Sequence, residues 1–231
     1  GIEAYTAWWK GDLKFASPEV REALDYMAKI YFTPDYVWGG SGAILGTNVT
    51  NAMDPMWGAA LDSLDDPECW MHKQATWLGP DFFPDMKAPG APECVVGADM
   101  GLFYFPPIKE ELGTPVLSAG DGLMVTADRP EVRAVAQFLA TATGMEVWVK
   151  SGKAISPNAA TPAEWVAGNY KGETAANMIA GATALGFDGG DLMPGPVGAG
   201  SFWSGMVDWI GAEGSNTDEV LAAIDASWPA E

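Results

Sequence analysis

The stretch that decides the fold is residues 187–206, which read FDGGDLMPGPVGAGSFWSGM. Glycine and proline at this density are typical of a loop rather than of a regular helix or strand. We therefore predict a loop whose backbone closely approaches another group, followed by a helix that begins near Ser201. Phe202 and Trp203 stand at the end of this loop. Such a pair either plugs the core or offers a flat face that stacks on a ligand.

Length and composition are those of a folded protein with an acidic surface. The chain has 231 residues, of which 48% are apolar, enough for one large domain or two small ones with a real core. The 31 acidic and 12 basic residues give a formal net charge of -19, which repels nucleic acid and anionic membranes. We therefore expect no nucleic-acid partner and no membrane insertion. The 11 tryptophans are a mild indication of sugars or other flat-faced ligands.

The sequence contains few histidines and cysteines, so a metal site would have to be built from carboxylates. Its only histidine is His72, and its two cysteines, Cys69 and Cys94, lack the CxxC spacing of zinc and redox sites. No calcium-loop spacing is present either. We therefore expect no metal and no cofactor. The two cysteines would pair in an exported protein and would stay thiols in the cytosol.

Helix signals are the clearest local patterns. Ser17, Pro18 and Glu19 predict a helix start, and apolar residues recur at helical spacing as far as Tyr31. A second clear helix begins around Pro130. Three capping boxes predict further helices: Thr143/Glu146 for 143–151, Thr161/Glu164 for 161–180 and Asn216/Glu219 for 216–228. A helix that is bent or divided at Pro55 is predicted over 48–64.

Short strands are predicted between the helices. The segments are 70–77, 102–105 and 123–126, each bounded by turn residues. Residues 81–92 are predicted to be loop. Because helices dominate and strands are few and short, the predicted fold class is helix-rich α/β.

The order of these elements resembles a known family. Residues 118–158 read SAGDGLMVTADRPEVRAVAQFLATATGMEVWVKSGKAISPN, with a glycine turn, a strand, a PEVxxxxxFLA helix, a second helix and an ISPN turn. This succession resembles the extracellular solute-binding proteins of ATP-driven importers, in the carbohydrate-binding branch that includes maltose- and α-glucoside-binding proteins. The LMP and FW elements of 187–206 and the helix SPEVREALDYMAKIY of 17–31 are similar to the same branch.

The resemblance implies a fold and a division of the chain. The fold is α/β, helix-rich and periplasmic-binding-protein type II-like. Family members have two lobes and nearly twice this length, and the sequence resembles their C-terminal half. By this analogy, residues 1–117 belong to the second lobe, 118–190 form a helical segment that crosses to the first lobe, and 191–231 are a returning loop and C-terminal helices. The crossing segment, without its partner strands, is expected to be the least well packed.

The resemblance also implies a function without catalysis. The protein would capture a sugar or oligosaccharide in the periplasm or extracellular space and deliver it to the membrane permease of an ABC importer. The full-length protein is expected to be a monomer. The CWMH element at Cys69, together with Cys94, resembles the disulfide-bearing members of the branch, which implies a Cys69–Cys94 disulfide.

An enzyme is the alternative function. A carbohydrate hydrolase would use a pair of carboxylates, and the many acidic residues do not exclude one. However, the sequence holds no GxSxG elbow, no HExxH motif and no phosphate loop.

Aromatic candidates for the sugar site follow from the resemblance. Sugar recognition places aromatic faces against the apolar side of the ring. Trp203 matches the family's aromatic position in the late loop and helix, and Phe202 is its neighbour. Trp77 follows a predicted strand where the family also has an aromatic residue, and Trp38 stands beside two glycines. The competing interpretation for each is core packing, or a hinge for Trp38.

Two aspartates are candidate acceptors of hydrogen bonds from sugar hydroxyls. They are Asp121 and Asp188, and each neighbours a glycine. The competing interpretation is an Asx turn, in which the carboxylate binds the backbone two residues on. For Asp191 the turn is the preferred interpretation.

Overall fold

The computed structural model describes residues 1–57, 63–77 and 93–230, and it divides the chain into two compact units. Unit 1 comprises residues 1–52, 107–119 and 183–231, and unit 2 comprises residues 53–106 and 120–182. Helices dominate both units. Among the described residues, no helix is long and apolar enough to cross a membrane.

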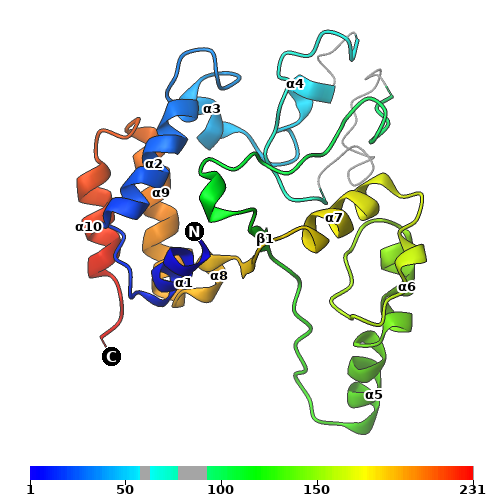
Figure 1. Cartoon of the computed structure of the whole chain (residues 1–231). Helices are drawn as coiled ribbons and strands as arrows, with labels where there is room; N and C mark the ends of the chain where they lie inside the picture. Colours follow the sequence, from blue (N-terminus) through cyan, green and yellow to red (C-terminus); the bar gives the residue numbers. More distant parts are fainter. Residues whose placement is uncertain (58–62, 78–92, 231) are drawn as a thin grey trace. The chain divides into compact units, whose positions relative to one another are not determined.

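Unit 1 contains most of the regular structure (Figure 1). Its helices and strands are α1 (Ile2–Lys10), α2 (Pro18–Tyr31), α3 (Ser41–Gly46), the 3-10 helix Glu110–Leu112, β1 (Val116–Ser118), β2 (Leu185–Phe187), α8 (Gly189–Leu192), the π-helix Pro196–Phe202, α9 (Trp203–Gly211) and α10 (Thr217–Ala226). Strands β1 and β2 pair in parallel, with Val116 opposite Leu185 and Ser118 opposite Phe187.

The core of unit 1 lies between α2, α9 and α10. Its buried members are Phe15, Leu24, Met193, Val197, Trp209, Val220, Leu221 and Ile224. The apolar stripe predicted on the helix at 17–31 is confirmed, because Leu24 is buried and the other stripe residues pack against this cluster. Each apolar side chain of this size contributes about 1.5–3 kcal/mol when fully buried.

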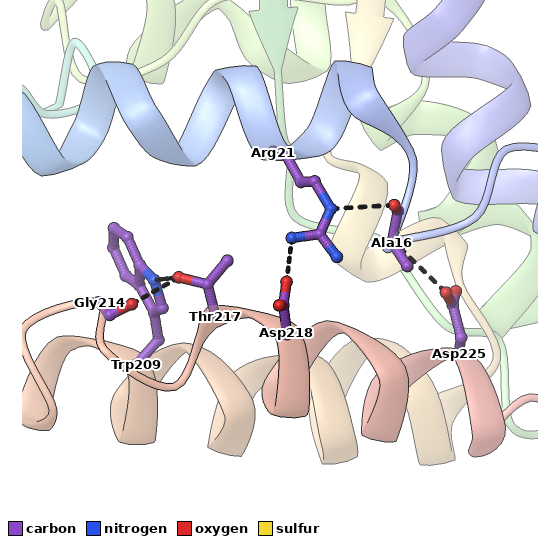
Figure 2. Close-up of polar contacts among 7 residues, drawn as sticks. All are labelled: Ala16, Arg21, Trp209, Gly214, Thr217, Asp218 and Asp225. Atoms are coloured by element: carbon purple, nitrogen blue, oxygen red, sulfur yellow. Dashed lines mark hydrogen bonds and ion pairs between the residues drawn. The ribbon is translucent and has the colours of Figure 1, made fainter.

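Polar contacts fix the start of α2 on α10 (Figure 2). The Asp225 carboxylate accepts hydrogen bonds from the backbone N–H of Phe15 at 2.7 Å and of Ala16 at 3.0 Å. Arg21 donates to the Ala16 carbonyl at 3.2 Å and forms an ion pair with Asp218. The backbone bonds to Asp225 matter more than the ion pair, since an exposed pair contributes about 0–1 kcal/mol.

Unit 2 is built around fewer regular elements. They are α4 (Asp54–Trp57), α5 (Pro130–Leu139), α6 (Ala142–Lys150), the 3-10 helix Ala163–Trp165 and α7 (Tyr170–Ala180). Met53 and Trp57 form a buried apolar pair, with Trp77, Cys94 and Met100 packed against them, and Val149 and Ala175 are buried as well. Lys171 is buried and donates from Nζ to the Trp77 carbonyl at 3.0 Å.

Most predicted helices are confirmed, with corrections at their starts. Ser17 caps α2 as predicted, and its side chain accepts from the Val20 N–H. The helix after Pro130 is present, and the next one is capped by Thr141 instead of Thr143. The helix predicted over 161–180 begins at Tyr170, because Asn169 caps it and the preceding residues form a 3-10 turn. The last helix forms with Asn216 at its N-cap position, although no side-chain cap bond is made.

The helix predicted over 48–64 is wrong for most of its described part. Residues 49–53 form turns, and helix α4 spans only Asp54–Trp57. The Asn48 side chain accepts from the Thr50 N–H at 3.0 Å, a local bond that competes with helix formation. Residues 58–62, and the loop predicted at 81–92, lie outside the described residues.

The predicted strands are wrong. Residues 70–77, 102–105 and 123–126 form no strand in the described part of the chain, whereas 116–118 and 185–187 pair. A strand needs a second strand beside it, and no strand pairs with these three segments among the described residues. The helix-rich α/β description therefore holds with one small two-stranded sheet among the described residues.

The loop predicted in residues 187–206, before the helix expected near Ser201, is also wrong, because most of these residues are helical. Helix α8 follows β2 directly, and the π-helix continues without a break into α9. The helix predicted near Ser201 therefore starts earlier. Close backbone packing, described below, explains why a glycine-rich sequence is helical here.

The disulfide prediction is a further correction. No disulfide joins Cys69 to Cys94 in the structure. Cys69 instead donates from Sγ to the Met71 carbonyl at 3.3 Å.

The chain passes between the units near two of the predicted boundaries. The predicted boundaries lie at about 118 and 190, and the chain passes between units at 119/120 and at 182/183. It also passes between them at 52/53 and 106/107, inside the segment 1–117. The correspondence of these units to the two lobes of the family stays a prediction.

Candidate functional site

The candidate site is built on the junction from β2 through α8 and the π-helix to α9, all in unit 1. At its start, the Asp188 side chain accepts from the backbone N–H of Gly190 at 2.8 Å and of Asp191 at 3.3 Å. The Tyr5 hydroxyl donates to the Phe187 carbonyl at 2.7 Å. Asp188 therefore forms an Asx turn, which was the competing interpretation of this residue. Its side chain remains partly exposed.

Glycine is required where α8 meets the π-helix. A Cβ atom at Gly198 would lie 1.9 Å from the Gly190 carbonyl oxygen, so the two backbones touch. Likewise, a Cβ atom at Gly189 would lie 2.7 Å from the Trp8 ring. The predicted close approach of this backbone is thus confirmed, although within helices rather than in a loop.

We expect Gly198→Ala to destabilise the protein and Gly195→Ala to leave it unchanged or slightly more stable. The alanine methyl at 198 collides with a backbone oxygen that cannot move aside, and overpacking of this kind costs about 1–3 kcal/mol or more. Gly195 has helical dihedrals, and nothing lies within 4 Å of the point where a methyl group would be added, so it is the matched control. Urea unfolding of both variants measures the difference, and equal midpoints would contradict the backbone contact.

The two aromatic residues at the junction differ in burial. Phe202 is partly buried, and its ring lies 5.4 Å from Trp8 in an edge-to-face arrangement and 5.2 Å from Phe15. Trp203, the next residue, is 71% exposed. Phe202 therefore packs in the core at the end of the π-helix, whereas the Trp203 indole is mostly exposed to solvent. A π-helix is a rare geometry that is frequent at functional sites.

The other candidate residues are distributed over both units. Trp38, in unit 1, is exposed and precedes Gly39 and Gly40, whose positive φ angles of 73° and 77° form the turn before α3. Trp77, in unit 2, is partly buried against the Met53–Trp57 pair. Asp121, also in unit 2, is exposed. Only Phe202, Trp203 and Asp188 are brought together by one stretch of unit 1.

Sequence reasoning missed Tyr5, which belongs to the same site. Its hydroxyl lies close enough to Asp188 for their charges to interact. The pKa of the Tyr5 hydroxyl is raised, mainly because the group is partly buried. A backbone hydrogen bond at Gly189 lowers this pKa, whereas the nearby Asp188 carboxylate raises it. The aromatic first helix was visible in the sequence, but its contact with a segment more than 180 residues away was not.

We expect the stability supplied by Tyr5 to be lost at alkaline pH. Because its pKa is raised in the folded state, that stability is fully present below the unfolded value of about 10 and is lost as the pH rises beyond it. Tyr5→Phe should cost about 0.5–1.5 kcal/mol at neutral pH through the lost hydrogen bond, and this cost should shrink above about pH 10. Urea unfolding at both pH values tests this, and a cost independent of pH would refute it.

Comparison with known proteins gives two relatives that match almost the whole chain. The chain is 35% identical over 228 residues to the "Alpha-glucosides-binding periplasmic protein AglE" of Rhizobium meliloti, covering 98% of this chain and 46% of that protein. It is 32% identical over 225 residues to the "Osmoprotective compounds-binding protein GgtB" of Synechocystis, covering 97% of this chain and 49% of that protein. The chain thus spans about half the length of these curated relatives. No family model matches the chain, and no solved structure matches it.

Proposed function

Because the chain belongs to the periplasmic solute-binding proteins of ABC importers, we propose that it is part of a receptor that captures a sugar. The receptor binds an α-linked sugar or oligosaccharide in the periplasm, outside the cytoplasm, and delivers it to a membrane permease. It does no chemistry on the sugar. Both relatives are named as binding proteins, which favours binding over the hydrolase alternative.

The observation that carries this proposal is the exposure of Trp203 on a rigid support. The Trp203 ring is 71% exposed, so its face is accessible to a ligand. The neighbouring Phe202 is held between Trp8 and Phe15, so the backbone that carries the indole is fixed in advance. A preorganised aromatic face is what the apolar side of a sugar ring requires.

Polar recognition in this proposal comes from the start of α8. A Cβ atom at Gly190 would lie 4.0 Å from the Phe202 ring, so the Asp188 turn is adjacent to the residue that anchors Trp203. The Asp188 carboxylate then accepts a hydrogen bond from a sugar hydroxyl while it keeps its backbone bonds. Trp38, Trp77 and Asp121 remain further candidates for ligand contact.

A titration with matched disaccharides tests the proposal. The full-length receptor is titrated with maltose and with cellobiose, which differ only in the configuration of the glycosidic bond, while its tryptophan fluorescence and binding heat are followed. We expect saturable binding of maltose and much weaker binding of cellobiose. Binding of neither sugar, or release of glucose during the incubation, would refute the sugar-receptor proposal.

A second ligand class is favoured by the name of the Synechocystis relative, which binds osmoprotective compounds. Glycine betaine is therefore included in the same titration. Its quaternary ammonium would bind an aromatic face by cation–π attraction instead of by stacking. Binding of glycine betaine with no response to maltose would favour this second class.

A further inference from the structure

Two Asp-Gly dipeptides occur in the chain, at Asp121–Gly122 and Asp188–Gly189. In such a pair the aspartate can cyclise onto the next backbone nitrogen, because glycine has no Cβ atom that hinders the approach to this nitrogen. The reaction also needs a carboxyl group and a backbone that are free to rotate. Since the two dipeptides share the same chemistry, their surroundings decide which of them reacts.

Asp121–Gly122 lies in a little-restrained segment of unit 2, residues 120–126. All seven residues are exposed, form no regular element and take part in no hydrogen bond within the described part of the chain. Figure 1 shows this stretch as an extended chain that leads to α5. Nothing lies within 4 Å of the points where Cβ atoms would be added at Gly120 and Gly122. A segment with so few contacts changes conformation at little cost in free energy.

Asp188–Gly189 is restrained at both residues. The Asp188 carboxylate accepts from the backbone N–H of Gly190 at 2.8 Å and of Asp191 at 3.3 Å. Gly189 is buried, and a Cβ atom there would lie 2.7 Å from an aromatic ring. A backbone hydrogen bond also joins Gly189 to the Tyr5 hydroxyl. Neither the carboxylate nor the nitrogen that it would have to meet can therefore move without breaking contacts.

We propose that Asp121 isomerises spontaneously to isoaspartate in the folded protein and that Asp188 is protected from this reaction. The Gly122 nitrogen attacks Cγ of the protonated Asp121 carboxyl group, and the hydroxyl oxygen leaves with the amide proton as water while a succinimide ring closes. Water then adds to the main-chain carbonyl of this ring and breaks the original peptide bond. The chain is now linked through Cγ, and the former main-chain carbon carries the carboxylate. One water is lost and one is gained, so no oxidant or cofactor is needed.

The product changes the chain close to 119/120, where it passes between the two units. Isoaspartate adds one methylene group to the main chain and displaces the carboxylate of Asp121, which is a candidate ligand contact. The isomerisation itself requires no sugar. A receptor that failed to bind maltose would still isomerise at Asp121, so the two proposals can fail separately.

Ageing in water enriched in heavy oxygen tests the proposal. The full-length protein is kept folded at neutral pH, and each passage through the succinimide places one heavy oxygen in the aspartyl residue. Mass spectrometry compares the peptides that contain Asp121 and Asp188, and methylation by an L-isoaspartyl methyltransferase identifies isoaspartate. We expect Asp121 to be labelled about 10- to 100-fold faster, because Asp188 reacts only when its hydrogen bonds open. Equal rates in the folded protein would overturn the proposal.

Two glycine substitutions and unfolding in urea are the controls. Gly122→Ala adds a methyl group beside the attacking nitrogen and should slow labelling at Asp121 severalfold, whereas Gly120→Ala adds the same group before Asp121 and should leave the rate unchanged. Both methyl groups enter open space, so neither should disturb the fold. In urea the rates at Asp121 and Asp188 should become similar. Unchanged labelling in Gly122→Ala, or a difference that persists in urea, would contradict protection by the fold.

Discussion

Trp203→Ala should weaken sugar binding by the full-length receptor about 70-fold while leaving its fold intact. Covering roughly 100 Å² of an indole at about 25 cal/mol per Å² is worth about 2.5 kcal/mol, which is close to 70-fold in affinity. The fold should survive, because the side chain is mostly in water and makes little contribution to the core.

The control for Trp203→Ala is Trp70→Ala. Trp70 is 73% exposed, which matches Trp203, and it lies in unit 2 outside the candidate site. Titration calorimetry with maltose measures the affinity of both variants, and circular dichroism checks the fold. Trp203→Phe keeps a smaller ring and should bind with intermediate affinity. A folded Trp203→Ala protein that binds maltose as tightly as the wild type would make Trp203 a bystander.

Trp209→Ala should have the largest effect on stability. The Trp209 side chain is 1% exposed, its ring centroid lies 5.0 Å from that of Phe32, and it contacts the core between α2 and α10. Truncation of a buried tryptophan costs about 3–5 kcal/mol, because it removes the transfer free energy and leaves a cavity. Since domains of this kind are stable by only about 5–15 kcal/mol, the variant should be close to unfolding.

One further substitution separates the contribution of the Trp209 ring from that of its hydrogen bond. The indole Nε1–H donates to the Thr217 hydroxyl at 2.9 Å, and this hydroxyl donates to the Gly214 carbonyl at 2.6 Å (Figure 2). Thr217→Val leaves the Trp209 ring in place but removes its acceptor, at a cost of about 1–3 kcal/mol. Urea unfolding of the protein compares the variants. A cost for Trp209→Ala no larger than that for Thr217→Val would refute the dominant role of the ring.

The start of α2 and the helix after Pro130 could be predicted because their signals are local. Ser17 reaches the Val20 N–H within one turn, so no distant contact is needed to place the cap. The same holds for the position of the last helix after Asn216. Thr141 and Thr143 are equally good cap residues two positions apart. Local signals do not decide between them, and the packing around the helix start selects Thr141.

The strands could not be predicted, because a strand is stable only beside a partner. Residues 123–126 have a stronger β pattern than 116–118, yet 116–118 pairs because residues 185–187 lie beside it. The sequence carries the preference of each segment, whereas the pairing depends on which segments the fold brings together. The cysteine pair shows the same limit, since the pairing implied by resemblance is not present in the structure.

By itself, the sequence determined the helix-rich composition, the acidic character and the family to which the chain belongs, because these depend on residue types and local order. It also singled out residues 187–206 and, within them, Phe202 and Trp203. Only the tertiary structure decided that Phe202 enters the core, that Trp203 faces solvent and that Tyr5 lies near Asp188. The physical reason is that the direction of a side chain depends on contacts such as those of Trp8 and Phe15 with Phe202, which are made across almost the whole length of the chain.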